Sequence, residues 1–180
     1  VLGETGITIL SEEDTDDKKR LSEEKVWIVD PLDGTTDFVN RTGEFTIMVG
    51  LVENQKSVLG LIYWPIKKKM YLAESGKGAF CYNEEWEKIE VTMMAEMQNC
   101  QALVSRHHLS EKEKKLLDEM EISVVTSIGS SLKVTEIASG EAEIYITTTD
   151  KMKQWDTCAS NCIISEAGGK MTDISGNDMV

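Results

Sequence analysis

Two aspartates stand three residues apart in the segment Asp30-Pro31-Leu32-Asp33-Gly34-Thr35. Pro31 fixes one backbone dihedral and Gly34 permits a tight bend, so both carboxylates can point to one side of a turn. Carboxylates this close repel each other unless a cation lies between them. Mg²⁺ suits such a place because it takes oxygen ligands and keeps sites for water and phosphate oxygens. The segment therefore predicts a magnesium site in which Thr35 orients a bound water. The alternative is an aspartate-capped turn without metal.

Two further acidic residues lie where predicted elements begin or end. The apolar run at residues 7–10 predicts a strand that ends just before Glu12, and the run at 26–29 predicts a buried strand that leads into Asp30. Asp156 opens a predicted helix at residues 156–166, where a carboxylate often only caps the helix. Because α/β folds gather their sites at strand ends and helix starts, these positions together strengthen the metal-site prediction.

The remaining pattern predicts a layered α+β architecture. Residues 12–25 are charge-rich and predict a loop or a short helix, whereas 45–52, 57–64 and 70–73 predict antiparallel strands. The second half alternates between strands at 102–104, 122–125 and 142–146 and helices at 110–120 and 130–138. Ser110 is the predicted N-cap of the first of these helices, with Glu113 completing a capping box. We expect two halves, residues 1–98 and 99–180, with a seam near residues 94–99.

Composition limits the partners of the chain. Its 180 residues carry a formal net charge of −13, which disfavours long nucleic acid but allows a small anion where metal ions reverse the local charge. No run approaches the ~20 apolar residues of a membrane span. Without an export leader, the four cysteines are predicted to be free thiols in the cytoplasm. The oligomeric state stays open, and a homodimer is compatible with the sequence.

Two strings resemble the paired signatures of the lithium-sensitive, magnesium-dependent phosphatases: WIVDPLDGTTDF at residues 27–38 and WDTCASNCIISEAGG at 155–169. That superfamily includes inositol monophosphatase, fructose-1,6-bisphosphatase and 3′(2′),5′-bisphosphate nucleotidase. The resemblance implies an αβαβα sandwich, two or three Mg²⁺ ions, and Glu13 as an auxiliary acid. It also implies that Thr35, Asp33 and Glu12 activate the attacking water. The implied metal ligands are Glu12, Asp30, the Leu32 carbonyl, Asp33 and Asp156.

Three further strings resemble the bacterial 3′(2′),5′-bisphosphate nucleotidases: NRTGEFT at 40–46, SRHH at 105–108 and SIGSSLK at 127–133. This resemblance implies hydrolysis of the 3′-phosphate of adenosine 3′,5′-bisphosphate to AMP and phosphate. It is compatible with a helix start at Gly129 and Ser130, where backbone N–H groups favour an anion. The implied substrate-binding residues are Gly34, Thr35, Ser105, His108, Gly129, Lys133 and Asp156.

The sequence also departs from the nucleotidase pattern. Thr36-Asp37 stands where that pattern has Lys-Glu, and His107 stands where it has Ser. The family has helices upstream of Val1 and a last strand beyond Asp173, so we expect a longer protein and an inactive isolated 180-residue fragment.

Several other functions compete with the nucleotidase prediction. Within the superfamily, inositol monophosphatase or fructose-1,6-bisphosphatase activity is the alternative, and a non-catalytic metal or nucleotide sensor is the alternative of another class. The aspartyl-nucleophile phosphatases require D-x-D-x-T and the cysteine phosphatases require C-x5-R. The first spacing is absent. Cys100 and Arg106 do stand at the second spacing, but the strand predicted at 102–104 lies between them. Because an extended strand rises about 3.3 Å per residue, it would hold the two side chains too far apart to act on one phosphate.

Overall fold

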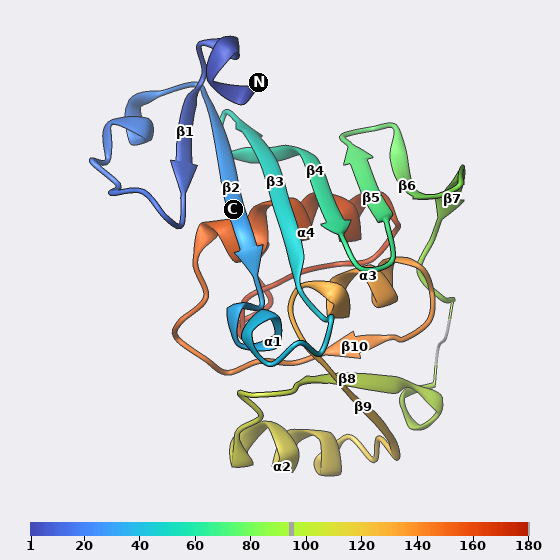
Figure 1. Cartoon of the computed structure of the whole chain (residues 1–180). Coiled ribbons are helices and arrows are strands. Elements are labelled where there is room, and N and C mark those ends of the chain that lie inside the picture. The colour runs from blue at the N-terminus through green and yellow to red at the C-terminus, as the bar shows by residue number, and fades with distance from the viewer. Residues whose placement is uncertain (94–95, 180) are drawn as a thin grey trace.

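The computed structural model describes residues 1–93 and 96–179, and in these ranges the chain forms two sheets and four α-helices (Figure 1). The predicted seam at residues 94–99 falls partly on Met94 and Ala95, which lie outside the described residues. The rest of it contains the 3₁₀ turn Met97–Asn99, which leads into the second sheet.

The larger sheet has seven strands in the order of the chain. The first two are parallel and every later pair is antiparallel. The five strands predicted from the sequence are confirmed with small shifts of their ends. The last two strands were not predicted. For β7 the reason is that nearly every residue is exposed, so buried and exposed residues do not alternate along it. The strands are β1 (Thr8–Ser11), β2 (Lys25–Asp33), β3 (Thr46–Glu53), β4 (Lys56–Trp64), β5 (Lys69–Glu74), β6 (Gly78–Asn83) and β7 (Glu85–Ile89). The 3₁₀ turns Leu2–Thr5 and Lys19–Ser22 precede β1 and β2.

The smaller sheet is parallel, with β8 (Gln101–Ser105) between β10 (Ile144–Tyr145) and β9 (Val124–Ile128). Two of its strands differ from the sequence prediction: β9 begins two residues later than expected, and β10 has only two residues. The helix α2 (Glu111–Glu119) has the predicted capping box. The Ser110 hydroxyl accepts the Glu113 N–H at 3.2 Å, and the Glu113 carboxylate accepts the Ser110 N–H at 2.8 Å.

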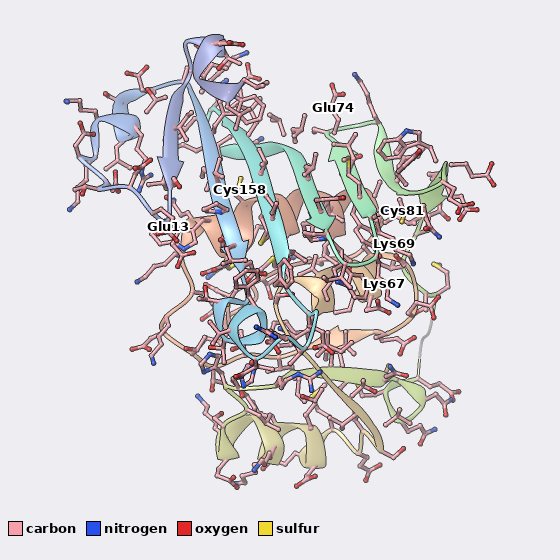
Figure 2. All side chains as sticks on the ribbon, viewed as in Figure 1. Glu13, Lys67, Lys69, Glu74, Cys81 and Cys158 are labelled. Atoms are coloured by element: carbon pink, nitrogen blue, oxygen red, sulfur yellow. The ribbon has the colours of Figure 1, made fainter. Side chains whose placement is uncertain are left out.

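The helix α4 (Gln154–Glu166) lies directly on the backbone of the large sheet. Gly50 of β3 and Gly60 of β4 face Cys158 and Ala159, and a Cβ on either glycine would collide with the helix. Figure 2 shows Cys158 at this junction between α4 and the strands. Because neither glycine has a side chain, α4 approaches the strands closely at these two positions, and it also contacts β2.

The elements stack in layers. The large sheet packs on α4 and α3 (Leu132–Ala138), α3 contacts β10 of the small sheet, and α2 packs on the far side of that sheet. This confirms the predicted layered α/β fold. The described residues form four of its five predicted layers. The division at residue 98 stays a prediction. Among the described residues, no helix has both the length and the apolar character that crossing a membrane requires.

Candidate metal centre and substrate cleft

A β-bulge places Asp30 and Asp33 on the same face of the large sheet. Asp30 pairs with Met48 and Asp33 with Thr46, so three steps along β2 oppose two steps along β3. Side chains alternate in a regular strand, so residues three apart would face opposite sides without the extra residue. Pro31 has no N–H to contribute and is tolerated at such an irregularity. The predicted convergence is therefore present, but it arises from a bulge inside β2 rather than from a turn after residue 29.

Gly34 turns the chain immediately after Asp33. Its φ is +87°, and a Cβ there would lie 3.0 Å from both the Glu44 carbonyl oxygen and Ser130 Cβ, so only glycine fits without strain. The short helix α1 (Thr35–Val39) begins at the next residue. The Thr35 hydroxyl donates to the Leu32 carbonyl at 3.3 Å, which brings the two groups predicted to act at the metal site together.

Asp156 joins the two aspartates from the first turn of α4. Asp30, Asp33 and Asp156 each offer one carboxylate oxygen, and these oxygens lie within 4.8 Å of one another. Asp156 also caps the helix, because its Oδ2 accepts the Lys153 N–H at 2.5 Å. The capping interpretation of this residue is therefore confirmed, and the metal-ligand interpretation stays a prediction with which its place in the cluster is compatible.

Glu12 lies at the border of this cluster. Its N–H donates to the Val29 carbonyl at 3.2 Å and extends the parallel pairing of β1 and β2, which brings Glu12 beside Asp30. Glu13 follows on the exposed surface beyond β1, as Figure 2 shows. The structure thus brings three predicted ligands into one cluster and Glu12 next to it.

The cluster has more negative charge than its own contacts neutralise. Burial raises the pKa of Asp30 to about 8, and repulsion from Asp33 and then Glu12 adds to this, although the Leu32 N–H opposes it by donating at 2.9 Å. Burial likewise raises the pKa of Asp156 to about 6, with Asp33 and Glu12 contributing. Oxygen-only donors that repel one another fit a hard divalent cation such as Mg²⁺.

Two hydroxyl residues that the sequence did not reveal orient Asp33. Its Oδ2 accepts the Ser131 N–H at 2.5 Å and the Thr46 hydroxyl at 3.2 Å. The hydroxyls of Thr46 and Ser131 are themselves 2.7 Å apart, and both residues are buried. Thr46 and Ser131 are far apart in sequence, so no local pattern could have identified this pair.

A cleft of about 370 Å³ extends from the aspartates toward the small sheet. All seven predicted substrate-binding residues line this one space. They are Gly34, Thr35, Ser105, His108, Gly129, Lys133 and Asp156, together with Asp33 of the metal cluster.

Lys133 differs from the sequence expectation in its surroundings. The helix α3 begins at Leu132 rather than Ser130, and Lys133 is buried. Its ammonium donates to the Ser130 carbonyl at 2.5 Å and the Ile128 carbonyl at 3.3 Å, and lies 5.1 Å from the centre of the Tyr145 ring. Burial lowers the pKa of Lys133, and nearby carboxylates oppose that shift.

One of the two backbone N–H groups expected to face an anion, that of Gly129, already has a carboxylate partner, and so does the N–H of Ser131. Gly129 N–H donates to the Glu44 carboxylate at 2.6 Å, and Ser131 N–H donates to Asp33. These two N–H groups are therefore used within the protein, and they tie the loop before α3 to two carboxylates from residues 1–98.

Comparisons with known proteins agree with this site. The profile of the inositol monophosphatase family matches residues 5–180. The chain is 36% identical to the 3′(2′),5′-bisphosphate nucleotidase CysQ of Salmonella typhimurium, over 96% of this chain and 69% of that protein. It is 31% identical to the inositol-1-monophosphatase of Bacillus subtilis, over 95% of this chain and 65% of that protein.

Solved structures show the same relationship. The crystal structure of CysQ from Bacteroides thetaiotaomicron, a bacterial member of the inositol monophosphatase family, superposes with a TM-score of 0.82 at 33% identity. That match covers 93% of this chain and 69% of the other. The three aspartates, their cleft and these matches together show that the chain belongs to the inositol monophosphatase family and is a metal-dependent phosphatase.

Proposed function

We propose that the protein is a magnesium-dependent phosphomonoesterase that removes the 3′-phosphate of adenosine 3′,5′-bisphosphate and releases AMP. One observation carries the proposal: a single cleft joins the aspartate cluster to a second group of polar residues that includes Ser105, His108 and Lys133. A phosphatase for a substrate with one phosphate needs only the first group. A second polar group suits a substrate whose leaving group also carries a phosphate.

Residues at the metal end would hold the scissile phosphate. Asp30, Asp33 and Asp156 would bind two or three Mg²⁺ ions together with Glu12 and the Leu32 carbonyl, and bound Mg²⁺ polarises the ester and lowers the pKa of its water. The Thr35 hydroxyl, beside that carbonyl, would orient the water. Because Ser131 and Thr46 fix Asp33, this carboxylate loses little freedom when it binds a cation.

Residues at the other end would hold the leaving group. The buried Lys133 ammonium supplies a positive charge, and Ser105 and His108 supply hydrogen-bonding groups after β8. These contacts lie away from the reacting bond, so they are made equally in the ground and transition states. Their loss should raise KM more than it lowers kcat.

An inositol phosphate is the second candidate substrate. Thr36-Asp37 departs from the nucleotidase pattern, and the Bacillus subtilis inositol-1-monophosphatase is 31% identical to this chain.

All four cysteines are free thiols, in keeping with the cytoplasmic location that the sequence predicts.

A turnover panel with the full-length protein tests the proposal. Adenosine 3′,5′-bisphosphate, inositol 1-phosphate and fructose 1,6-bisphosphate are compared at saturating Mg²⁺, with EDTA as the control. The proposal expects the highest kcat/KM with the nucleotide and no turnover in EDTA. A higher kcat/KM with inositol 1-phosphate would instead establish the sugar phosphatase function.

A further inference from the structure

The leaving-group end of the cleft has carboxylates where an anion is expected. Gly129 lies against Asp37, because a Cβ on Gly129 would collide with the Oδ2 atom of that carboxylate. The N–H of Gly129 donates to the Glu44 carboxylate at 2.6 Å. A second phosphate beside Gly129 would therefore meet two negative groups unless both are neutralised by partners.

Each of these carboxylates has a cationic or hydrogen-bonding partner. Glu44 receives the Arg106 guanidinium at 2.5 Å. The Oδ1 of Asp37 accepts the Thr42 hydroxyl at 2.7 Å and lies 3.6 Å from Arg106 Nε. Its Oδ2 lies 3.1 Å from His107 Nε2. The oxygen that faces Gly129 is thus the oxygen that His107 holds.

No nearby cation replaces His107 at this oxygen in the described contacts. Arg106 approaches the other oxygen of Asp37, and Lys133 donates to two backbone carbonyls. The Asp37 side chain is only 2% exposed, so water has little access to it, whereas the His107 side chain is 31% exposed and lines the cleft. An ionised carboxylate only accepts hydrogen bonds, so Nε2 of His107 carries the hydrogen.

We propose that His107 is a positioning residue that determines specificity: its Nε2–H masks the Asp37 carboxylate so that a leaving group with a second negative charge can bind beside Gly129 and Lys133. This inference rests on the proposed function for the place of the second phosphate. It concerns residues that the nucleotidase resemblance does not explain, since His107 and Asp37 are both departures from that pattern.

Four variants test the masking role: His107→Ala, His107→Gln, Asp37→Asn and the double variant Asp37→Asn with His107→Ala. His107→Ala should raise KM for adenosine 3′,5′-bisphosphate roughly tenfold, the size expected for one hydrogen bond to a charged group, with kcat changed less than about twofold. KM for inositol 1-phosphate should change less than about twofold, since its leaving group carries no charge. His107→Gln keeps an N–H donor and should stay near the wild type.

The double variant separates masking from direct contact. Without the Asp37 charge there is nothing to mask, so removing His107 from Asp37→Asn should leave KM unchanged. Added salt should also reduce the KM increase of His107→Ala, because ions screen the Asp37 carboxylate that the variant leaves uncovered. Thermal melting of each variant shows that it folds. His107 lies in an exposed turn and tolerates truncation, and Asn has the shape of Asp.

Two results would overturn the inference. One is an equal KM increase for both substrates, and the other is a full KM increase in the double variant. Failure of the proposed function is a different result: the wild type then has a higher kcat/KM with inositol 1-phosphate or fructose 1,6-bisphosphate than with the nucleotide. The same four variants are then compared on fructose 1,6-bisphosphate, whose leaving group also carries a phosphate. If the wild type turns over no bisphosphate, then no doubly charged substrate is accepted and the masking role is also refuted.

Discussion

Carboxylates occur at both ends of the cleft, and the difference between the ends lies in their partners. At the metal end Asp30, Asp33 and Asp156 face one another, and mutual repulsion helps to raise the pKa of Asp30 to about 8. At the leaving-group end Asp37 and Glu44 are held by His107 and Arg106. In the part of the chain that the structure describes, no ion pair holds the three aspartates, so we call this cluster unpaired and expect it to attract a cation, whereas under the proposed function the paired carboxylates accept an anion beside them. On this proposal the sign of the ligand follows from the pairing of the carboxylates rather than from their number.

Removal of one charge from the metal end should give the largest effect. We expect Asp33→Asn to lower kcat by about 10²-fold or more, the loss seen when one preorganised electrostatic contact is removed. The amide oxygen of Asn can still accept the Ser131 N–H, and less repulsion remains in the cluster, so the metal-free melting temperature should hold or rise.

Steady-state kinetics at saturating Mg²⁺ and melting in EDTA check this prediction. The matched control is Asp118→Asn on the exposed surface of α2, which should change neither quantity. A near-normal kcat for Asp33→Asn would show that the unpaired cluster does not bind the catalytic metal.

Removal of the Lys133 ammonium from the leaving-group end should give the next largest effect, and it should appear in KM rather than in kcat. Lys133→Ala should lower kcat/KM for adenosine 3′,5′-bisphosphate roughly 10- to 150-fold through KM, because a hydrogen bond to a charged group contributes about 1.5–3 kcal/mol. The loss should be small with inositol 1-phosphate. Lys114→Ala, which removes an exposed partner of Glu111, is the control. Equal losses with both substrates would contradict a leaving-group role for Lys133.

The unpaired end also predicts how stability depends on pH and metal. Without metal, the folded protein holds a proton on Asp30 up to about pH 8, whereas the unfolded chain releases it near 3.8. The stability from this group is therefore full below pH 3.8 and is lost as the pH rises through about 8. Bound Mg²⁺ replaces the proton, so the gain in melting temperature with Mg²⁺ should grow between about pH 5 and about pH 9.

Calorimetric melts with Mg²⁺ or EDTA across that range measure this gain. The Asp30→Asn variant should show a weaker dependence on pH, because its side chain does not titrate. A Mg²⁺ effect that is constant with pH in the wild type would mean that proton and cation do not compete at Asp30.

A change outside both ends should give the smallest effect. Ser110→Ala removes the hydroxyl that accepts the Glu113 N–H at the start of α2, which should cost about 1 kcal/mol of stability. Because α2 packs on the far side of the small sheet, kcat and KM should stay at wild-type values. Chemical denaturation measures the stability. A KM change with either substrate would show that the small sheet transmits strain to the cleft.

The sequence predicted the metal end because its information is local. Asp30, Asp33 and Thr35 lie in one short segment after an apolar run, and Asp156 lies at the start of an apolar helix. The means of convergence was not predictable, since a bulge depends on the pairing of β2 with β3 and not on β2 alone. The predicted turn at Pro31 was wrong for this reason.

The leaving-group end was less predictable because its contacts join distant segments. Glu44 binds Arg106 and Gly129, and Asp37 binds His107. The strings at 105–108 and 127–133 located this end of the cleft, but they assigned a free backbone N–H to Gly129 that Glu44 occupies. The Glu44 carboxylate, which lies far from Gly129 in the sequence, occupies this N–H group. Neither helix propensity nor hydrophobic periodicity near Gly129 could have predicted that contact.

Because of the bulge in β2, the metal site depends on the exact number of residues between Asp30 and Asp33. The single extra residue of the bulge converts an odd spacing into an even one, so that both carboxylates share a face. Deletion of Leu32 would restore regular pairing while leaving every carboxylate in the sequence, but it would also remove the carbonyl that accepts the Thr35 hydroxyl. Insertion of one residue would turn Asp33 toward the opposite face of the sheet. Changes of length in this segment should therefore be more damaging than most changes of side chain, with the two aspartates as the exceptions.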